Sequence, residues 1–271
     1  MKKGILIGLV ILVGFACEEK KEEKDNSKAS EIKTEKPKKK EDVFTDLTEE
    51  GIKKKILSFL SKNEDHFLTD SCFRIYRGQM NHDKIEDWVV AVNEREYAKK
   101  ILTEKGNLGA IDMGYLGNFN HIFVIDGATG KWSGRPIGSS SEAPLEIELD
   151  YVNSEQYQVV KIFYRVNTSK FVGIYNSSIP SFQEIFKWEL YNLSDNQAGG
   201  KPTGRIVEFV GEPTSKKSIL IYEADVVGFD DQAFVNQMFT YEPKLKKSSQ
   251  EPIHVFEYQL SEGKFGEMKK D

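Results

Sequence analysis

Apolar and polar residues alternate along most of the chain after residue 70, which is the pattern of a β-strand with one buried face. Phe186 and Trp188, for example, alternate with Lys187 and Glu189. Strands of this one-sided kind are typical of antiparallel sheets. The predicted strands are Phe73 to Arg77, Trp88 to Val92, His121 to Ile125, Leu145 to Val152, Val159 to Val166, Phe171 to Tyr175, Ile185 to Leu190, Arg205 to Val210, Ile219 to Ala224, Phe239 to Glu242 and Ile253 to Leu260.

Helical spacing of apolar residues is confined to two short segments. Apolar side chains from Ile52 to Leu60 predict an N-terminal helix, with Asp46 and Glu49 as a capping box at its start. A second short helix is predicted from Glu94 to Lys105. We therefore expect a mainly β fold, an antiparallel and irregular propeller-like or sandwich-like domain with one N-terminal helix.

The N-terminus has the features of an export signal. Lys2 and Lys3 precede an apolar run that ends at Cys17 and is too short to span a bilayer. The end of the run resembles the lipobox of bacterial lipoproteins, in which the cysteine is lipidated and becomes the new N-terminus. That resemblance implies that residues 1–17 are a lipoprotein signal peptide, which is cleaved before Cys17, and that the lipid on Cys17 anchors the protein. The match departs from the usual pattern at Gly14, where leucine is typical.

Residues 18–42 are predicted to be a disordered tether, because acidic and basic residues dominate them and almost no apolar side chain is present. Glu18 and Glu19 resemble the export signal of surface lipoproteins in the Bacteroidetes. The expected location is the outer membrane, with a β-rich globular domain of residues 43–271 on its periplasmic or cell-surface face.

Charge and cysteine content exclude several classes of function. Loss of Lys2 and Lys3 takes the formal net charge from −5 to −7, so the domain repels phosphate backbones and we expect no nucleic acid partner. The only cysteine besides Cys17 is Cys72, so neither an internal disulfide nor a cysteine-based zinc site can form. Cys72 is expected to be a buried, inert thiol.

One motif resembles a known repeat. Residues 78–90 are similar to the turn and following strand of FG-GAP/VCBS-type repeats, in which acidic and amide side chains bind calcium or cap the turn. The resemblance implies that Asn81, Asp83 and Asp87 are the oxygen donors. Gln79 replaces the first acidic ligand and Lys84 replaces the glycine of the left-handed position, so we favour a metal-free turn, with calcium as the alternative and no other cofactor.

Motifs of nucleophilic or phosphate chemistry are absent from the sequence, and the segment Gly138 to Ser141 reads as a loop. We therefore expect a non-catalytic binding or assembly module. Its partner would be a protein or glycan that contacts loops such as Asn107 to Asn120 and Asn196 to Gly204. The alternative is an envelope hydrolase of glycan or peptide that uses carboxylates on separate strands, for example Asp87 and Asp150.

Overall fold

The computed structural model describes residues 42–61, 68–176, 179, 181–194, 201–212 and 216–269. They belong to a compact unit of residues 41–271. Cys17 and nearly all of the predicted tether lie outside the described residues. Within the described part, no helix is long and apolar enough to cross a membrane.

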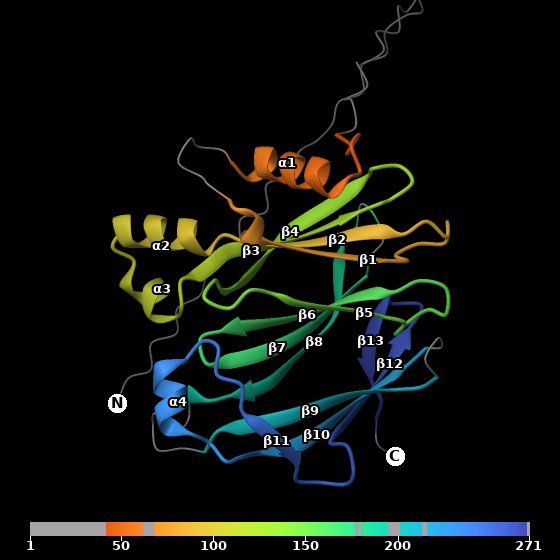
Figure 1. The fold of residues 1–271 in the computed structure, drawn as a ribbon. Coiled ribbons are helices and arrows are strands. Elements are labelled where there is room, and N and C mark those ends of the chain that lie inside the picture. The colour runs from red at the N-terminus through yellow and green to blue at the C-terminus, as the bar shows by residue number, and fades with distance from the viewer. Residues whose placement is uncertain are drawn as a thin grey trace, which may run out of the picture. The chain divides into compact units, whose positions relative to one another are not determined.

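The described residues form two antiparallel sheets, and the predicted mainly β, sandwich-like class is confirmed (Figure 1). Sheet A has the strand order β1-β2-β3-β4, which is also the chain order. Sheet B has the order β13-β12-β10-β9-β8-β7-β6-β5, and β11 pairs with β10. The strands are β1 Phe73–Gly78, β2 Asp87–Asn93, β3 Leu116–Ile125, β4 Trp132–Ser140, β5 Glu146–Asp150, β6 Val159–Val166, β7 Ser169–Asn176, β8 Gln183–Asn192, β9 Thr203–Val210, β10 Ser218–Val227, β11 Lys244–Lys247, β12 His254–Gln259 and β13 Lys264–Glu267.

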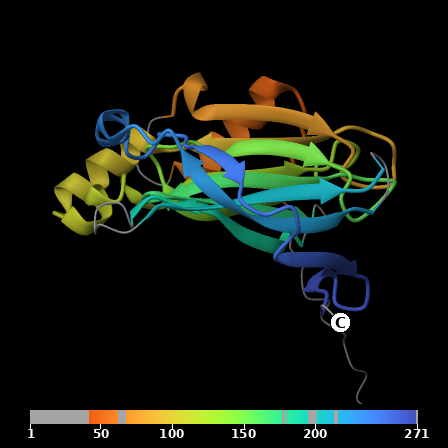
Figure 2. The ribbon, with the colours of Figure 1, turned by 90° about the horizontal axis from the view of Figure 1, so that it is seen from below.

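The described residues include four α-helices, of which the first covers one face of sheet A. They are α1 Glu49–Leu60, α2 Arg95–Glu104, α3 Leu108–Asp112 and α4 Asp231–Asn236, and a 3₁₀ turn, η1, spans Asp70–Cys72. Viewed from below, α2 and α3 lie at one end of the sheets and the β12–β13 hairpin lies at the other (Figure 2). The predicted N-terminal helix and the second short helix are thus both present.

Three layers share the main core. Ile52 and Ile56 of α1 are fully buried against Val90 and Ile125 on one face of sheet A. The other face of sheet A packs on sheet B, where Val160 and Ile162 meet Val89, Ile122 and Val124. Apolar burial of this extent is the main stabilising contribution to the sandwich.

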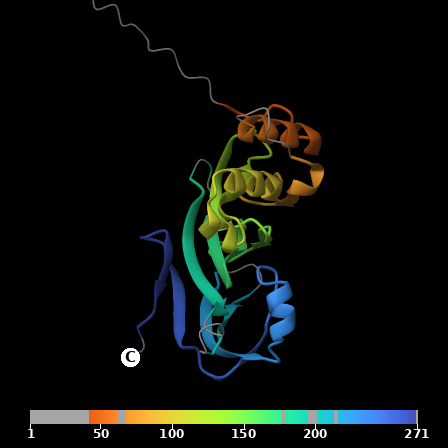
Figure 3. The same ribbon diagram turned by 90° about the vertical axis from the view of Figure 1, so that its left-hand side faces the viewer.

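Strand β6 is buried on both faces because sheet B bends back on itself. Val160 and Ile162 face sheet A, while Val159 and Phe163 pack with residues of β8, β9 and β10. Figure 3 shows the bend between β5–β8 and the strands that follow β8. Among the described residues, the pairing between β8 and β9 is limited to Tyr191–Asn192 of β8 with Thr203–Gly204 of β9.

Several local predictions are wrong. Residues 239–242 do not form a strand, and the neighbouring strand is the lysine-rich β11, which as an edge strand needs no fully apolar face. Asn107 to Asn120 is not a loop, because it contains α3 and the start of β3. The N-cap of α1 is Thr48, whose hydroxyl accepts the N–H of Gly51, so the Asp46–Glu49 capping box is not formed.

Residues 138–141 were expected to be a loop, but β4 runs to Ser140. Ser139, Ser140 and Ser141 are fully buried, and their hydroxyl groups donate hydrogen bonds to the carbonyl oxygens of Ile137, Met113 and Tyr115. Because each buried hydroxyl has a carbonyl acceptor, serine can replace the apolar residues expected in a buried strand.

Candidate functional site

A cleft of about 420 Å³ lies where sheet B bends, between β5–β7 and β9. We call it the β9 cleft. Its apolar lining consists of Phe163, Val172, Leu190, Ile206, Val207, Phe209, Pro243 and Leu245. Its polar lining consists of Glu146, Glu148, Lys161, Lys170, Tyr191, Arg205 and Glu242.

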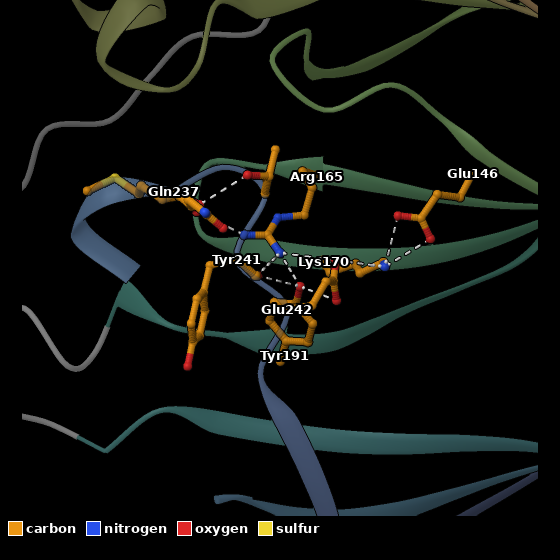
Figure 4. A network of polar contacts seen from close by, with 9 residues as sticks. Glu146, Arg165, Lys170, Tyr191, Gln237, Tyr241 and Glu242 are labelled. Atoms are coloured by element: carbon orange, nitrogen blue, oxygen red, sulfur yellow. Dashed lines mark hydrogen bonds and ion pairs between the residues drawn. The ribbon is translucent and has the colours of Figure 1, made fainter. Parts of the chain in front are cut away.

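A row of polar side chains closes one end of the β9 cleft (Figure 4). Arg165, Lys170 and Tyr191 are direct cross-strand neighbours on β6, β7 and β8. Two cations at opposed positions repel each other. Glu242 offsets this repulsion, because its Oε1 lies 2.9 Å from Nζ of Lys170 and 3.7 Å from Nη1 of Arg165. Nζ of Lys170 is also 3.1 Å from Oε2 of Glu146.

Arg165 connects this row to the segment between α4 and β11. Its side chain is only 3% exposed. Nη1 donates to the hydroxyl of Tyr191 and, over 3.0 Å, to the carbonyl oxygen of Tyr241. Nη2 donates to the carbonyl oxygen of Met238, also over 3.0 Å. A planar guanidinium suits this role because its donors point in several fixed directions.

Tyr191 is held as a hydrogen-bond donor. Its hydroxyl donates to Oε2 of Glu242 over 2.9 Å. Burial raises the pKa of Tyr191 well above its ordinary value, and Glu242 adds to the rise although Arg165 opposes it. The phenol therefore stays protonated at physiological pH.

A second ion-pair group lies near Lys161 of the cleft wall. Nζ of Lys161 is 2.8 Å from Oδ2 of Asp150, and Nζ of Lys217 donates to Oδ1 of Asp150 over 2.7 Å. Burial acts to raise the pKa of Asp150, but the hydrogen bonds from the two lysines outweigh it, and the pKa lies below its ordinary value. Asp150 is therefore a structural anion that joins the end of β5 to the start of β10.

The turn that resembles FG-GAP repeats contains one residue in the left-handed conformation. Lys84 has φ +64°, the left-handed conformation of the glycine that it replaces. Oδ1 of Asn81 accepts the N–H of Asp83, and Oδ1 of Asp83 accepts the N–H of Ile85, each over 2.8 Å. These are Asx-type contacts that hold a turn without a metal.

Asp87, the third predicted oxygen donor, is fully buried. Its carboxylate accepts the N–H of Met80 over 2.9 Å and the N–H of Gly127 over 2.8 Å. Burial raises the pKa of Asp87, although these two backbone bonds oppose the rise. Asn81 also donates to Asp126 over 3.2 Å, so the turn and the β3–β4 hairpin are joined.

The structure brings Asn81 and Asp87 to one small cavity of about 220 Å³, which His82 and Asp126 also line. In the described part of the chain, no three His, Cys, Asp or Glu side chains gather closely enough to hold a metal ion. Oxygen atoms of Asn81, Asp83 and Asp87 accept backbone N–H groups, and calcium binding stays an untested alternative.

Asp87 and Asp150, the example carboxylates of the hydrolase alternative, have separate partners. Asp87 begins β2 in sheet A, and Asp150 ends β5 in sheet B. The cavity that Asp87 lines does not include Asp150.

Two polar groupings in the structure have no counterpart among the sequence predictions. His121 on β3 lies 2.9 Å from the buried carboxylate of Glu94, beside an aromatic cavity of about 430 Å³. The row of Arg165, Lys170 and Tyr191 was also missed. A sequence signal did exist for the row, since Arg165 and Lys170 flank the Asn167–Thr168 hairpin turn at equal distances, which places them opposite each other.

No protein-family model, curated protein sequence or solved structure matches this chain. The FG-GAP resemblance and the lipobox therefore rest on the residues that carry them.

Proposed function

We propose that this chain is a lipid-anchored envelope protein that binds a ligand in the β9 cleft without catalysing a reaction. The anchor is Cys17, and the membrane is the outer membrane. The proposal for the anchor is supported by the N-terminal sequence pattern, and the proposal for binding is supported by the cleft. A groove of this size with apolar walls and a few polar groups is the usual form of a binding site.

The observation that carries the binding role is the state of the charged groups in the cleft. Lys161, Lys170 and Glu242 are all held in ion pairs with neighbouring side chains. Such groups orient a ligand and select its charge, whereas a general acid or base needs a proton that it can transfer near neutral pH. The hydrolase alternative has less support, because Asp150 is bound by two lysines and Asp87 by two backbone amides.

The anchor is tested in the native host by intact mass and detergent partition. Wild-type protein is expected to lack residues 1–16, carry acyl chains and enter the detergent phase. Cys17→Ala is expected to keep its apolar segment without acylation. Wild-type protein that retains residues 1–16 without fatty acid would remove the envelope assignment.

The binding role is tested by passing envelope extract over the immobilised full-length chain. The matched variants are Phe209→Ser, which changes the cleft wall, and Leu260→Ser, which changes an exposed apolar residue outside the cleft. Bound material is expected to fall with Phe209→Ser and to stay unchanged with Leu260→Ser, while circular dichroism shows both variants folded. Equal retention by both variants would show that the cleft is not the binding site.

A further inference from the structure

The β9 cleft lies along a strand edge that has little pairing. β9 forms seven residue pairs with β10 on one side, from Gly204 to Val210. On its other side it forms only two pairs with β8, at Thr203 and Gly204. Among the described residues, no other strand pairs with this second edge. Beyond Gly204 the edge is therefore open.

The lining of the β9 cleft shows that it follows this edge. Arg205, Ile206 and Val207 are consecutive residues of β9, and all three line the cleft. Side chains of consecutive strand residues point to opposite faces, so a cavity that touches all three must reach the backbone edge itself. The residues from Arg205 to Phe209 are half-buried, as expected for a strand that lacks a neighbour.

An open strand edge is a template for an added strand, because its free N–H and C=O groups can continue the hydrogen-bond ladder. The open part of β9 runs from Arg205 to Val210, which spans about 20 Å at the usual rise per strand residue. An extended segment of about six residues would match it.

The charges at the rim select the side chains of such a segment. Glu146, Glu148 and Glu242 are 55%, 59% and 51% exposed, whereas Lys161 and Lys170 beneath them are 7% and 11% exposed. Of the charged groups most exposed at the cleft, three are these glutamates and one is Arg205, which is 32% exposed, so the charge that an incoming chain meets first is mainly negative. The walls below the rim include the apolar side chains of Val207 and Phe209.

We infer that the β9 cleft binds an extended peptide segment of a partner protein, which alternates apolar and basic residues and adds as a strand to the open edge of β9. The inference rests on the proposed binding function and names its ligand class. Alternation follows from strand geometry, because the apolar residues would face Val207 and Phe209 while the basic residues reach the acidic rim.

A glycan fits this cleft less well. Sugar rings bind to open aromatic faces, but Nζ of Lys161 lies 4.0 Å from the ring centre of Phe209. Nζ of Lys170 is 5.9 Å from the ring centre of Phe163. The lysines thus occupy positions over both phenylalanine rings of the cleft, and the guanidinium of Arg165 lies 5.1 Å from the ring centre of Tyr191.

The test titrates synthetic peptides into the full-length chain in detergent. The first peptide alternates valine and lysine over eight residues. The second has the same composition with the valines and lysines in two blocks, and the third replaces each lysine with glutamate. The alternating lysine peptide is expected to bind about tenfold more tightly than either control, because only it satisfies both the spacing and the charge.

Backbone pairing is tested by N-methylation of the alternating lysine peptide, either at all valines or at all lysines. Only alternate residues of a strand hydrogen-bond to a given neighbour. One methylated set is therefore expected to weaken binding about tenfold and the other to have little effect. Hydrogen exchange at residues 205–210 is expected to slow when the unmodified peptide binds. Equal binding of both methylated sets, or no slowing, would overturn strand addition.

The outcomes separate this inference from the proposed function. In one outcome, the chain retains envelope material in a way that depends on Phe209 but shows no preference for the alternating peptide. That result would overturn the peptide inference and leave the proposed binding function in place. Retained material that resists protease but is lost after periodate oxidation would assign the cleft to a glycan. Loss of Phe209-dependent retention and of peptide binding together would overturn both.

Discussion

Replacement of Arg165 by methionine tests whether the buried polar row holds the bend of sheet B. Methionine is similar in length and apolar, so it fills much of the space but removes every donor. The carbonyl oxygens of Met238 and Tyr241 would each lose a hydrogen bond of 3.0 Å, and Glu242 would lose one of its two cations. The change therefore separates hydrogen bonding from packing.

The expected loss follows from the number of groups left without a partner. An unsatisfied buried polar group costs about 1 to 3 kcal/mol, and Glu242 is half exposed and can turn to water. We expect Arg165→Met to lower the free energy of unfolding by roughly 3 to 4 kcal/mol. For a domain of this size, that loss lowers the melting temperature by roughly 6 to 16 °C.

The assay is urea unfolding followed by tryptophan fluorescence, with two companion variants. Arg165→Lys keeps the charge but cannot reach several acceptors at once, so it is expected to lose about half as much stability. Arg135→Met changes an exposed arginine of β4 and is expected to stay within about 0.5 kcal/mol of wild type. An Arg165→Met protein within about 1 kcal/mol of wild type would show that the row does not stabilise the bend.

Three further predictions concern other parts of the domain. Lys84→Gly is expected to raise the free energy of unfolding by about 0.5 to 1 kcal/mol, because glycine adopts φ +64° without steric cost. Asn167→Gly, at φ +53°, is the companion variant in the same urea assay. It should raise the free energy of unfolding by less, since asparagine tolerates this backbone region. Asp150→Asn is expected to lose about 2 kcal/mol at pH 7. Because the pKa of Asp150 lies below its ordinary value of 3.8, this stabilisation is present above that pH and lost as the pH falls through the folded-state pKa, so the difference between the wild-type and variant melting temperatures should shrink as the pH is lowered below 3.8. Millimolar calcium is expected to leave the melting temperature unchanged, and a rise that Asp83→Asn abolishes would restore the calcium alternative.

The turn of residues 78–87 shows which hydrogen bonds a local sequence pattern can predict. The repeat that residues 78–90 resemble has glycine at the position of Lys84, and Lys84 has φ +64° in the structure. The bonds within the turn join residues two to seven positions apart, so the sequence contains most of the information about them. The link from Asp87 to Gly127 spans 40 residues, and no local pattern indicates it.

The sequence by itself determined the β class, the positions of most strands and the N-terminal helix, because these depend on spacings of two and of three to four residues along the chain. Only the tertiary structure decided which faces are covered. Lys161 and Arg165 lie on one face of β6, on either side of Phe163, and charged residues are typical of a solvent-facing side of a strand. They are buried because sheet B bends at Tyr191 and brings β9 over that side of β6. A period of two separates the faces of a strand, but contacts between residues distant in the chain decide what each face meets, and here they create the cleft.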